Sequence, residues 1–191
     1  MELSDELLVG RAQENDPDAF RKLVDKYKAK IYYIACRVMG NHSDADDVAQ
    51  ETFIRAYRGL KKFKGHSLFY TWLYRILINC CMDSLRKRKR RGGDLRLDEA
   101  AQMEERAVGS GVTTGPAEAV HSAELNELQR AVADALESLS LKHRMALVLH
   151  EFDGMAHQDI AQVMGCSIGT ARSRLHYARM KMQQKLRKFV E

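Results

Sequence analysis

The chain has 191 residues, 45% of them apolar, which is enough for one domain or two small ones with packed cores. Its net charge of +5 is unevenly spread, with 19 basic and 12 acidic residues in 1–92, 2 and 6 in 93–123, and 10 and 8 in 124–191. Both ends therefore suit a polyanion. Because the sequence has neither a run of roughly 20 apolar residues nor a secretory leader, we expect a cytoplasmic globular protein.

Cysteine and histidine spacing argues against a metal site and a disulfide framework. The four cysteines, Cys36, Cys80, Cys81 and Cys166, form no C-x-x-C pair. Adjacent side chains on a helix point about 100° apart, so a bond between Cys80 and Cys81 is disfavoured, and a redox role is the lesser alternative. The seven histidines also lack paired ligand spacing. We expect no metal and no cofactor.

Proline usage and apolar periodicity predict an all-α fold. Neither of the two prolines, Pro17 and Pro116, interrupts a long periodic segment, and no strand pattern competes. The first amphipathic helix is predicted over residues 18–38, with Asp16 and Pro17 as cap and first-turn residue and Gly40 as its stop.

Two further helices are predicted in the first half of the chain. One begins at Ser43 with an acidic first turn, and its buried stripe consists of Val48, Ala49, Phe53, Ala56, Tyr57 and Leu60. After a break at residues 64–67, the other runs from about Leu68 into the basic block at residues 86–91, which Gly92 and Gly93 end.

The third predicted helix combines aromatic and basic side chains. Within six residues it carries Phe69, Tyr70, Trp72 and Tyr74, and Arg75, Asn79 and the basic block follow. Aromatic rings offer stacking faces for unpaired bases and cations bind the phosphates, so this pattern indicates single-stranded nucleic acid. The alternative is that aromatic residues at helical spacing belong to the core, and for Trp72 and Tyr74 the two interpretations are equally favoured.

The second half begins with an acidic, glycine-rich linker predicted over residues 93–123. A helix resumes near Pro116 or Ala117, another covers residues 142–152, and a third covers residues 157–164.

Residues 154–179 predict a helix-turn-helix. Gly165 tolerates a left-handed turn, Ser167 can cap the second helix, and Ile168, Ala171 and Leu175 recur on its inward face. Its outward residues are Arg172, Ser173, Arg174 and His176. No acidic residue occurs between Asp159 and Glu191, whereas the basic residues there are Arg172, Arg174, Arg179, Lys181, Lys185, Arg187 and Lys188. A glycine turn, a serine cap and a periodic core within one basic segment indicate DNA binding rather than a solvated basic helix.

In this order the segments resemble the extracytoplasmic-function (ECF) sigma factors of bacterial RNA polymerase, within the sigma-70 family. SDADDVAQETF at residues 43–53 resembles the polymerase-binding helix of that family. TWLYRI at residues 71–76, with Asn79 and Asp83, resembles the minus-ten segment, and GTARSRL at residues 169–175 resembles the minus-thirty-five recognition helix. The resemblance implies region 2 in residues 1–92, a linker in 93–123 and region 4 in 124–191.

The resemblance also implies roles for individual residues. The polymerase clamp would be contacted by Asp47, Gln50, Glu51 and Arg55. A base flipped from the non-template strand would be captured by Phe69, Tyr70, Trp72 and Asn79. Phosphates near the minus-ten element would be bound by Arg75 and the basic block, including Arg86 and Arg88. The minus-thirty-five element would be read by Ser167, Gly169, Thr170, Arg172, Ser173, Arg174, His176, Tyr177 and Arg179.

Three positions depart from the family pattern. The family usually has a proline after the turn that opens the second domain, where this chain has Ser140. Position 177 is commonly arginine but is tyrosine here, and Ala156 replaces the usual serine or threonine cap. We therefore expect the helix at residues 157–164 to begin less firmly.

The function expected is promoter recognition and opening as a dissociable polymerase subunit, without catalysis or a small-molecule substrate. The resemblance implies core RNA polymerase and promoter DNA as partners, and an anti-sigma factor, often membrane-tethered, as inhibitor. One alternative is a stand-alone helix-turn-helix regulator, which needs a sensing or dimerising domain that the first half does not suggest. Another is an enzyme acting on nucleic acid, but no nucleophile pair, carboxylate cluster or metal motif appears.

Overall fold

The computed structural model describes residues 3–91 and 116–189, except for the side chains of residue 91 and residues 116–126. Within these residues the fold is all-α, as predicted. The helices are α1 (Asp5–Gln13), α2 (Pro17–Met39), α3 (His42–Leu60), α4 (Phe69–Arg91), α5 (Pro116–Glu137), α6 (Leu141–Glu151), α7 (His157–Met164) and α8 (Ile168–Leu186), with a 3-10 turn at Arg187–Phe189. No helix of this described part is long and apolar enough to cross a membrane.

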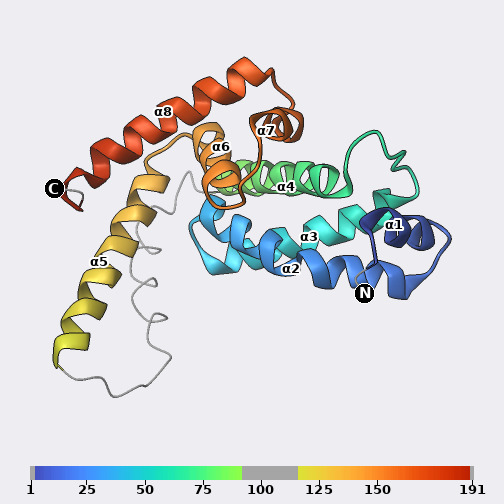
Figure 1. The fold of residues 1–191 in the computed structure, drawn as a ribbon, viewed down its shortest axis with the longest axis horizontal. Helices are drawn as coiled ribbons and strands as arrows, with labels where there is room; N and C mark the ends of the chain where they lie inside the picture. Colours follow the sequence, from blue (N-terminus) through green and yellow to red (C-terminus); the bar gives the residue numbers. More distant parts are fainter. Residues whose placement is uncertain (1–2, 92–115, 190–191) are drawn as a thin grey trace.

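Helices α1–α4 form a first bundle in which α2 packs on α3 and α3 packs on α4 (Figure 1). The predicted start of α2 is confirmed, because the Asp16 carboxylate accepts bonds from the backbone N–H groups of Asp18 and Ala19. Its predicted stop is confirmed as well, since Gly40 adopts a left-handed conformation and its N–H donates to the Cys36 carbonyl. Local chemistry therefore sets both ends of this helix.

Helix α3 starts at His42 instead of the predicted Ser43, and its outer face is more exposed to water than predicted. The cap is Asn41 rather than Ser43, because the Asn41 side-chain oxygen accepts the backbone N–H of Asp44 at 2.8 Å. Tyr57, which was expected in the buried stripe, is 60% exposed and packs edge-on against Phe20. The phenol hydroxyl favours contact with water at a position where periodicity alone predicts burial.

The sequence did not predict α1, whose nine residues are too few for a helix that is stable alone. It is held by packing, because Leu8, Val9 and Ala12 are buried. The Gln13 amide also donates to the backbone carbonyls of Leu60 and Phe63, at 2.9 and 2.8 Å. These bonds fasten the loop that leads into α4.

Helices α6–α8 and the end of α5 form a second bundle that contains the predicted helix-turn-helix. Gly165 has a φ of +59° and ends α7, and the Ser167 hydroxyl accepts the backbone N–H of Thr170 at 3.1 Å. Ala156 makes no side-chain cap bond, as expected. Ile168 was expected in the core but is 42% exposed, because it is the first residue of α8 and the buried stripe begins one turn later, at Ala171.

The two bundles pack on each other, which the sequence did not predict. Helix α7 lies on α4, and α6 and α5 contact α2 (Figure 1). Most of the predicted linker, residues 93–115, lies outside the described residues, while a helix does resume at Pro116. The domain boundaries at 92 and 124 stay a prediction.

The glycine turn between α7 and α8 generates a stability prediction. Replacing Gly165 with alanine places a Cβ in the left-handed region, so we expect Gly165→Ala to lower the free energy of unfolding by about 1–2 kcal/mol in chemical denaturation. Gly10→Ala is the control, because Gly10 lies within α1 and a Cβ there meets nothing within 4 Å. We expect that change to be stabilising by about 0.5–1 kcal/mol. Equal effects of the two substitutions would contradict the assignment of the turn.

Candidate nucleic-acid interface

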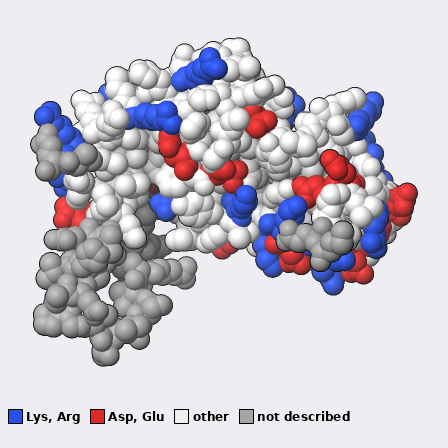
Figure 2. Space-filling view, in the orientation of Figure 1, with Lys and Arg blue, Asp and Glu red and all other residues white. Residues whose placement is uncertain are grey.

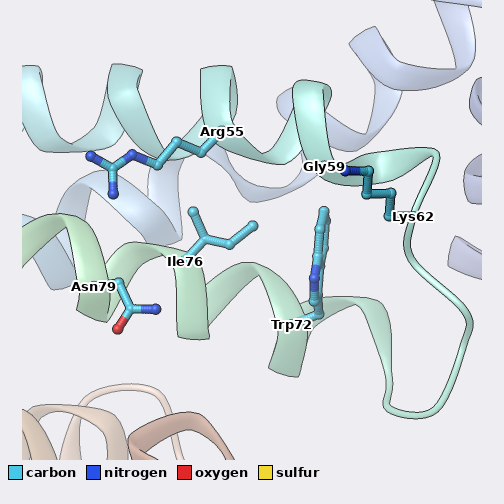
Figure 3. A pocket seen from close by; sticks show the side chains of 6 residues that line it. All are labelled: Arg55, Gly59, Lys62, Trp72, Ile76 and Asn79. Atoms are coloured by element: carbon cyan, nitrogen blue, oxygen red, sulfur yellow. The ribbon is translucent and has the colours of Figure 1, made fainter.

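A cavity of about 340 Å³ opens between α3 and α4, and it brings together side chains that can hold a nucleotide (Figure 3). Its lining residues are Arg55, Gly59, Lys62, Trp72, Ile76 and Asn79. The Trp72 ring extends from α4 toward α3, where a Cβ on Gly59 would lie 3.3 Å from its Cζ2 atom. Gly59 therefore leaves the space that the indole occupies. We call this cavity the α3–α4 pocket.

The predicted aromatic cluster divides between this pocket and the core. Phe69 and Tyr74 are 5% and 1% exposed, so the core interpretation is confirmed for Tyr74, and Phe69 lies behind the pocket rather than on its surface. Trp72 is half-buried and packs on the rings of Phe63 and Phe69, with centroids 5.0 and 5.8 Å away. Of the four residues predicted to capture a base, the pocket therefore combines Trp72 and Asn79.

Tyr70, the fourth predicted capture residue, faces the second bundle. Its hydroxyl donates to Asp159 Oδ2 on α7, at 3.1 Å. Burial, and then the hydrogen bond to Asp159, raise the pKa of Tyr70, so the phenol stays protonated and remains a donor.

The predicted polymerase contacts fall into two groups. Asp47 and Gln50 are exposed on the outer face of α3. Glu51 and Arg55 instead form an ion pair, with Nε 2.6 Å from Oε1, and the guanidinium also reaches Asp83 on α4 at 2.9 Å. The hydrogen bonds to Asp83 and then to Glu51 raise the pKa of Arg55 above its usual value. Arg55 thus connects the two walls of the α3–α4 pocket, a link that sequence spacing does not reveal.

Basic side chains line the exposed end of α4. Residues 86–90 are all exposed, and Arg88 Nη1 lies 3.3 Å from the Asp44 carboxylate in the first turn of α3. Arg75 is exposed one turn before Asn79. Lys62 was not predicted, although the cluster Lys61-Lys62-Phe63-Lys64 was a visible signal. Positive charge suited to a phosphate backbone is therefore supplied by Lys62 at one end of the pocket and by the exposed basic residues along α4, whereas Arg55 is paired with Glu51 and Asp83.

The recognition helix α8 exposes part of its predicted reading surface. Arg172 and His176 are exposed, and the exposed Tyr177 ring packs on His143 with centroids 4.5 Å apart. Burial, and then the nearby Arg174 charge, lower the pKa of His143, which favours its neutral form against Tyr177.

Several other residues predicted to read the minus-thirty-five element form hydrogen bonds or ion pairs within the second bundle. Ser173 Oγ donates to the Gly169 carbonyl at 3.0 Å, and the hydroxyls of Ser167 and Thr170 are paired at 2.9 Å. Arg179 is paired with Glu151 at 2.6 Å. Arg172 and His176 are exposed and have no such partner among the hydrogen bonds described above, so their predicted role in base reading stays a prediction.

The adjacent cysteines Cys80 and Cys81 are poorly placed for thiol chemistry. Cys80 and Cys81 are buried in the first bundle, and burial raises the pKa of Cys81 to about 12. A thiol with so high a pKa carries little thiolate at neutral pH and is a poor nucleophile. Among the described residues no group of three or more histidine, cysteine or acidic side chains is placed to hold a metal ion.

The two bundles match two parts of one protein family. Residues 23–91 match Sigma-70 region 2, and residues 129–182 match Sigma-70, region 4. The chain is 36% identical over 187 residues to the ECF RNA polymerase sigma-E factor of Haemophilus influenzae, covering 97% of this chain and 96% of that protein. The chain belongs to the ECF sigma factors.

Other relatives are similar over nearly their whole length. The sigma-E factor of Salmonella typhimurium is 37% identical, with 99% of this ECF sigma factor and 97% of that protein covered. The RNA polymerase sigma-H factor of Pseudomonas aeruginosa is 41% identical, with 92% and 90% covered.

Two solved structures are similar to this sigma factor across both bundles. CnrH, in complex with the cytosolic domain of CnrY, superposes with a TM-score of 0.70 at 27% identity, covering 96% of this chain and 97% of that one. RpoE of Bartonella quintana, in complex with the anti-sigma factor NepR, gives a TM-score of 0.64 at 26% identity, covering 88% and 96%.

Proposed function

We propose that this ECF sigma factor binds core RNA polymerase through α3, opens promoters at α4 and anchors upstream through α8. The α3–α4 pocket carries the proposal, because it places one indole and one carboxamide in the same space as the Lys62 cation, while Arg55 joins the two walls through its pairs with Glu51 and Asp83. An unpaired base stacks on an aromatic ring, an amide reads its hydrogen-bonding edge, and cations hold its phosphates. A duplex-binding regulator has no use for such a pocket.

The outer face of α3 supports a polymerase contact beyond its acidic residues. Ile54 and Tyr57 are exposed beside Gln50, and together with Phe20 and Phe53 they border a cavity of about 380 Å³. Exposed apolar side chains flanked by carboxylates are typical of a protein-binding surface. We infer that the exposed Asp47 gives this surface its orientation on a basic partner, together with Glu51 one turn further along α3, which also pairs with Arg55.

Charge reversal on this face tests the polymerase contact. We expect Asp47→Arg and Glu51→Arg each to weaken binding to core polymerase by about tenfold or more, because like charges then oppose each other, while helical content is unchanged. A polymerase pull-down measures this. Asp25→Arg is the control, since Asp25 is an exposed carboxylate of α2 whose ion pair is local, with Lys28. Wild-type binding by both α3 variants would contradict the assignment.

Promoter opening tests the α3–α4 pocket. We expect Trp72→Ala and Asn79→Ala to leave closed promoter complexes nearly intact and to impair opening, with a loss of about 1–3 kcal/mol for the stacking residue. Permanganate reactivity of thymines near the start site measures opening directly. A promoter with a pre-opened mismatch lacks much of the unpairing cost and should partly rescue Trp72→Ala, but it should not restore base preference to Asn79→Ala. Normal promoter opening by both variants would contradict base capture and leave Trp72 and Asn79 with a structural role only.

Two arginines of α8, the exposed Arg172 and the half-buried Arg174, test upstream reading. We expect Arg172→Ala and Arg174→Ala each to cost about 1–3 kcal/mol and to relax sequence preference at single positions, because arginine reads base edges in the major groove. Lys185→Ala is the matched comparison, because Lys185 is exposed on the same helix and should contact only phosphate. Its removal should weaken binding to all sequences and reduce the slope of log affinity against log salt concentration by about 1. An equal loss of discrimination in all three variants would overturn this division.

An inhibitory protein partner also fits this sigma factor. The similar structure of CnrH contains the cytosolic domain of CnrY, and that of RpoE contains the anti-sigma factor NepR. In both, the similarity to this chain extends over the two bundles. We propose that an anti-sigma factor binds this chain in the same way. Copurification from cells, followed by identification of the bound protein, tests this partner.

A further inference from the structure

A second cavity, of about 330 Å³, lies where the two bundles meet, and we call it the interbundle cavity. Helix α4 forms one wall, and α6, α7 and the first turns of α8 form the other. Its volume is at the lower end of the range of about 300–1,000 Å³ that is typical of sites for small molecules. The space therefore suits one compact ligand rather than a polymer.

Hydrogen bonds beside the interbundle cavity fix the spacing of its walls. Tyr70 Oη donates to Asp159 Oδ2 and Tyr74 Oη donates to Asp153 Oδ1, both at 3.1 Å. Lys30 Nζ lies 3.7 Å from the same Asp153 oxygen, and the Asp153 side chain is only 13% exposed. These bonds to an acceptor shielded from water are correspondingly strong, so the cavity has a defined shape.

Three cations line the interbundle cavity, and no acidic side chain does. They are Arg75 of α4, Lys142 in the first turn of α6 and the half-buried Arg174 of α8. Arg75 reaches across the space, because its Nη2 atom lies 3.9 Å from where a Cβ on Gly165 would be. Within the part of the chain that the structure describes, none of the three forms an ion pair. An anion between them would offset their mutual repulsion.

This grouping differs from the charge pattern of the outer surface. On the face shown in Figure 2, lysine and arginine side chains form separate clusters with acidic side chains between them. Two surface cations, Lys28 and Arg179, are paired with carboxylates at 2.7 and 2.6 Å. The interbundle cavity instead has cations on both walls and no carboxylate to neutralise them. Its charge is therefore suited to a ligand with more than one negative charge.

The rest of the lining is apolar and suits a flat ring. Ile78 and Met145 are buried at the bottom of the cavity, and the half-buried Met82 and Met164 lie on opposite walls. Methionine side chains adapt to irregular space, and their sulfur atoms make favourable contacts with aromatic rings. The exposed Asn79 carboxamide also lines the cavity and offers both a donor and an acceptor. Such a lining fits an aromatic ring with a polar edge.

We propose that the interbundle cavity binds a single nucleoside phosphate. The phosphate, which carries about −1.5 to −2 charges at pH 7, lies between Arg75, Lys142 and Arg174. The base packs on the methionines and its edge meets Asn79. An aliphatic anion would leave the Asn79 carboxamide without a partner, and inorganic phosphate would leave the apolar lining uncovered. The site does not depend on the proposed function, because binding requires neither polymerase nor promoter.

Isothermal titration calorimetry of the full chain tests this site. The ligands are adenosine 5′-monophosphate and guanosine 5′-monophosphate, with adenosine and inorganic phosphate as the two halves of the molecule. We expect one nucleotide to bind per chain with a Kd below about 1 mM. Adenosine and inorganic phosphate should each bind about tenfold or more weakly, since each keeps only part of the contacts.

Two lysine variants locate the bound nucleotide. Lys142→Ala removes a cation of the interbundle cavity and should weaken nucleotide binding by about tenfold. Lys62→Ala is the matched control, because Lys62 is an equally exposed lysine of the α3–α4 pocket, which shares Asn79 with this cavity. That control should bind the nucleotide like wild type. Circular dichroism checks that helical content is unchanged in both.

Four outcomes would overturn the nucleotide site. The first is the absence of saturable binding of either nucleotide. The second is equally tight binding of inorganic phosphate, which would leave only an unspecific anion site. The third is loss of binding in Lys62→Ala but not in Lys142→Ala, which would place the nucleotide in the α3–α4 pocket. The fourth is an equal loss in both variants, which would reduce the effect to net charge. None of these results bears on core-dependent initiation, so the proposed function is tested separately.

Discussion

Helix α4 contacts α1, α2 and α3 in the first bundle and α7 in the second, and the remaining structure depends on how its surface is divided among them. Leu73 and Leu77 are buried in the first bundle, Trp72 and Asn79 line the α3–α4 pocket, and Tyr70 contacts α7. A helix with apolar residues on most of its circumference must be covered on most sides. Here one part of that cover is α7, which belongs to the other DNA-binding domain.

The polar contacts between α4 and its neighbours differ in how well they are shielded from water. The ion pair of Arg55 with Asp83 is more than one-third exposed, so it stabilises the packing of α3 on α4 only modestly. The pair of Arg55 with Glu51 lies within α3 itself. The carboxylate of Asp153, by contrast, is shielded where it meets Tyr74 and Lys30. The contact between the two bundles at Asp153 is therefore more strongly shielded from water than the ion pairs of Arg55.

The sequence predicted what local chemistry decides. The cap at Asp16, the left-handed Gly165 and the cap at Ser167 each depend on residues within a few positions, and all are confirmed. Features that depend on distant partners were missed, because periodicity does not say which neighbour covers a face. Helix α1 exists through burial against α2. Phe69 is buried among the rings of the first bundle, and Tyr74 is buried where its hydroxyl meets Asp153, between α6 and α7. The roles of individual site residues remain predictions, although Trp72 and Asn79 do share one pocket.

This ECF sigma factor gives RNA polymerase a promoter preference rather than binding DNA as an independent regulator. The most direct measurement is run-off transcription of genomic DNA by purified core polymerase, with and without the chain, with start sites mapped by sequencing. The account predicts new starts, present only with both proteins, that share one upstream and one downstream element at fixed spacing. Identical starts in both reactions, together with protection of duplex DNA by the chain alone, would contradict it.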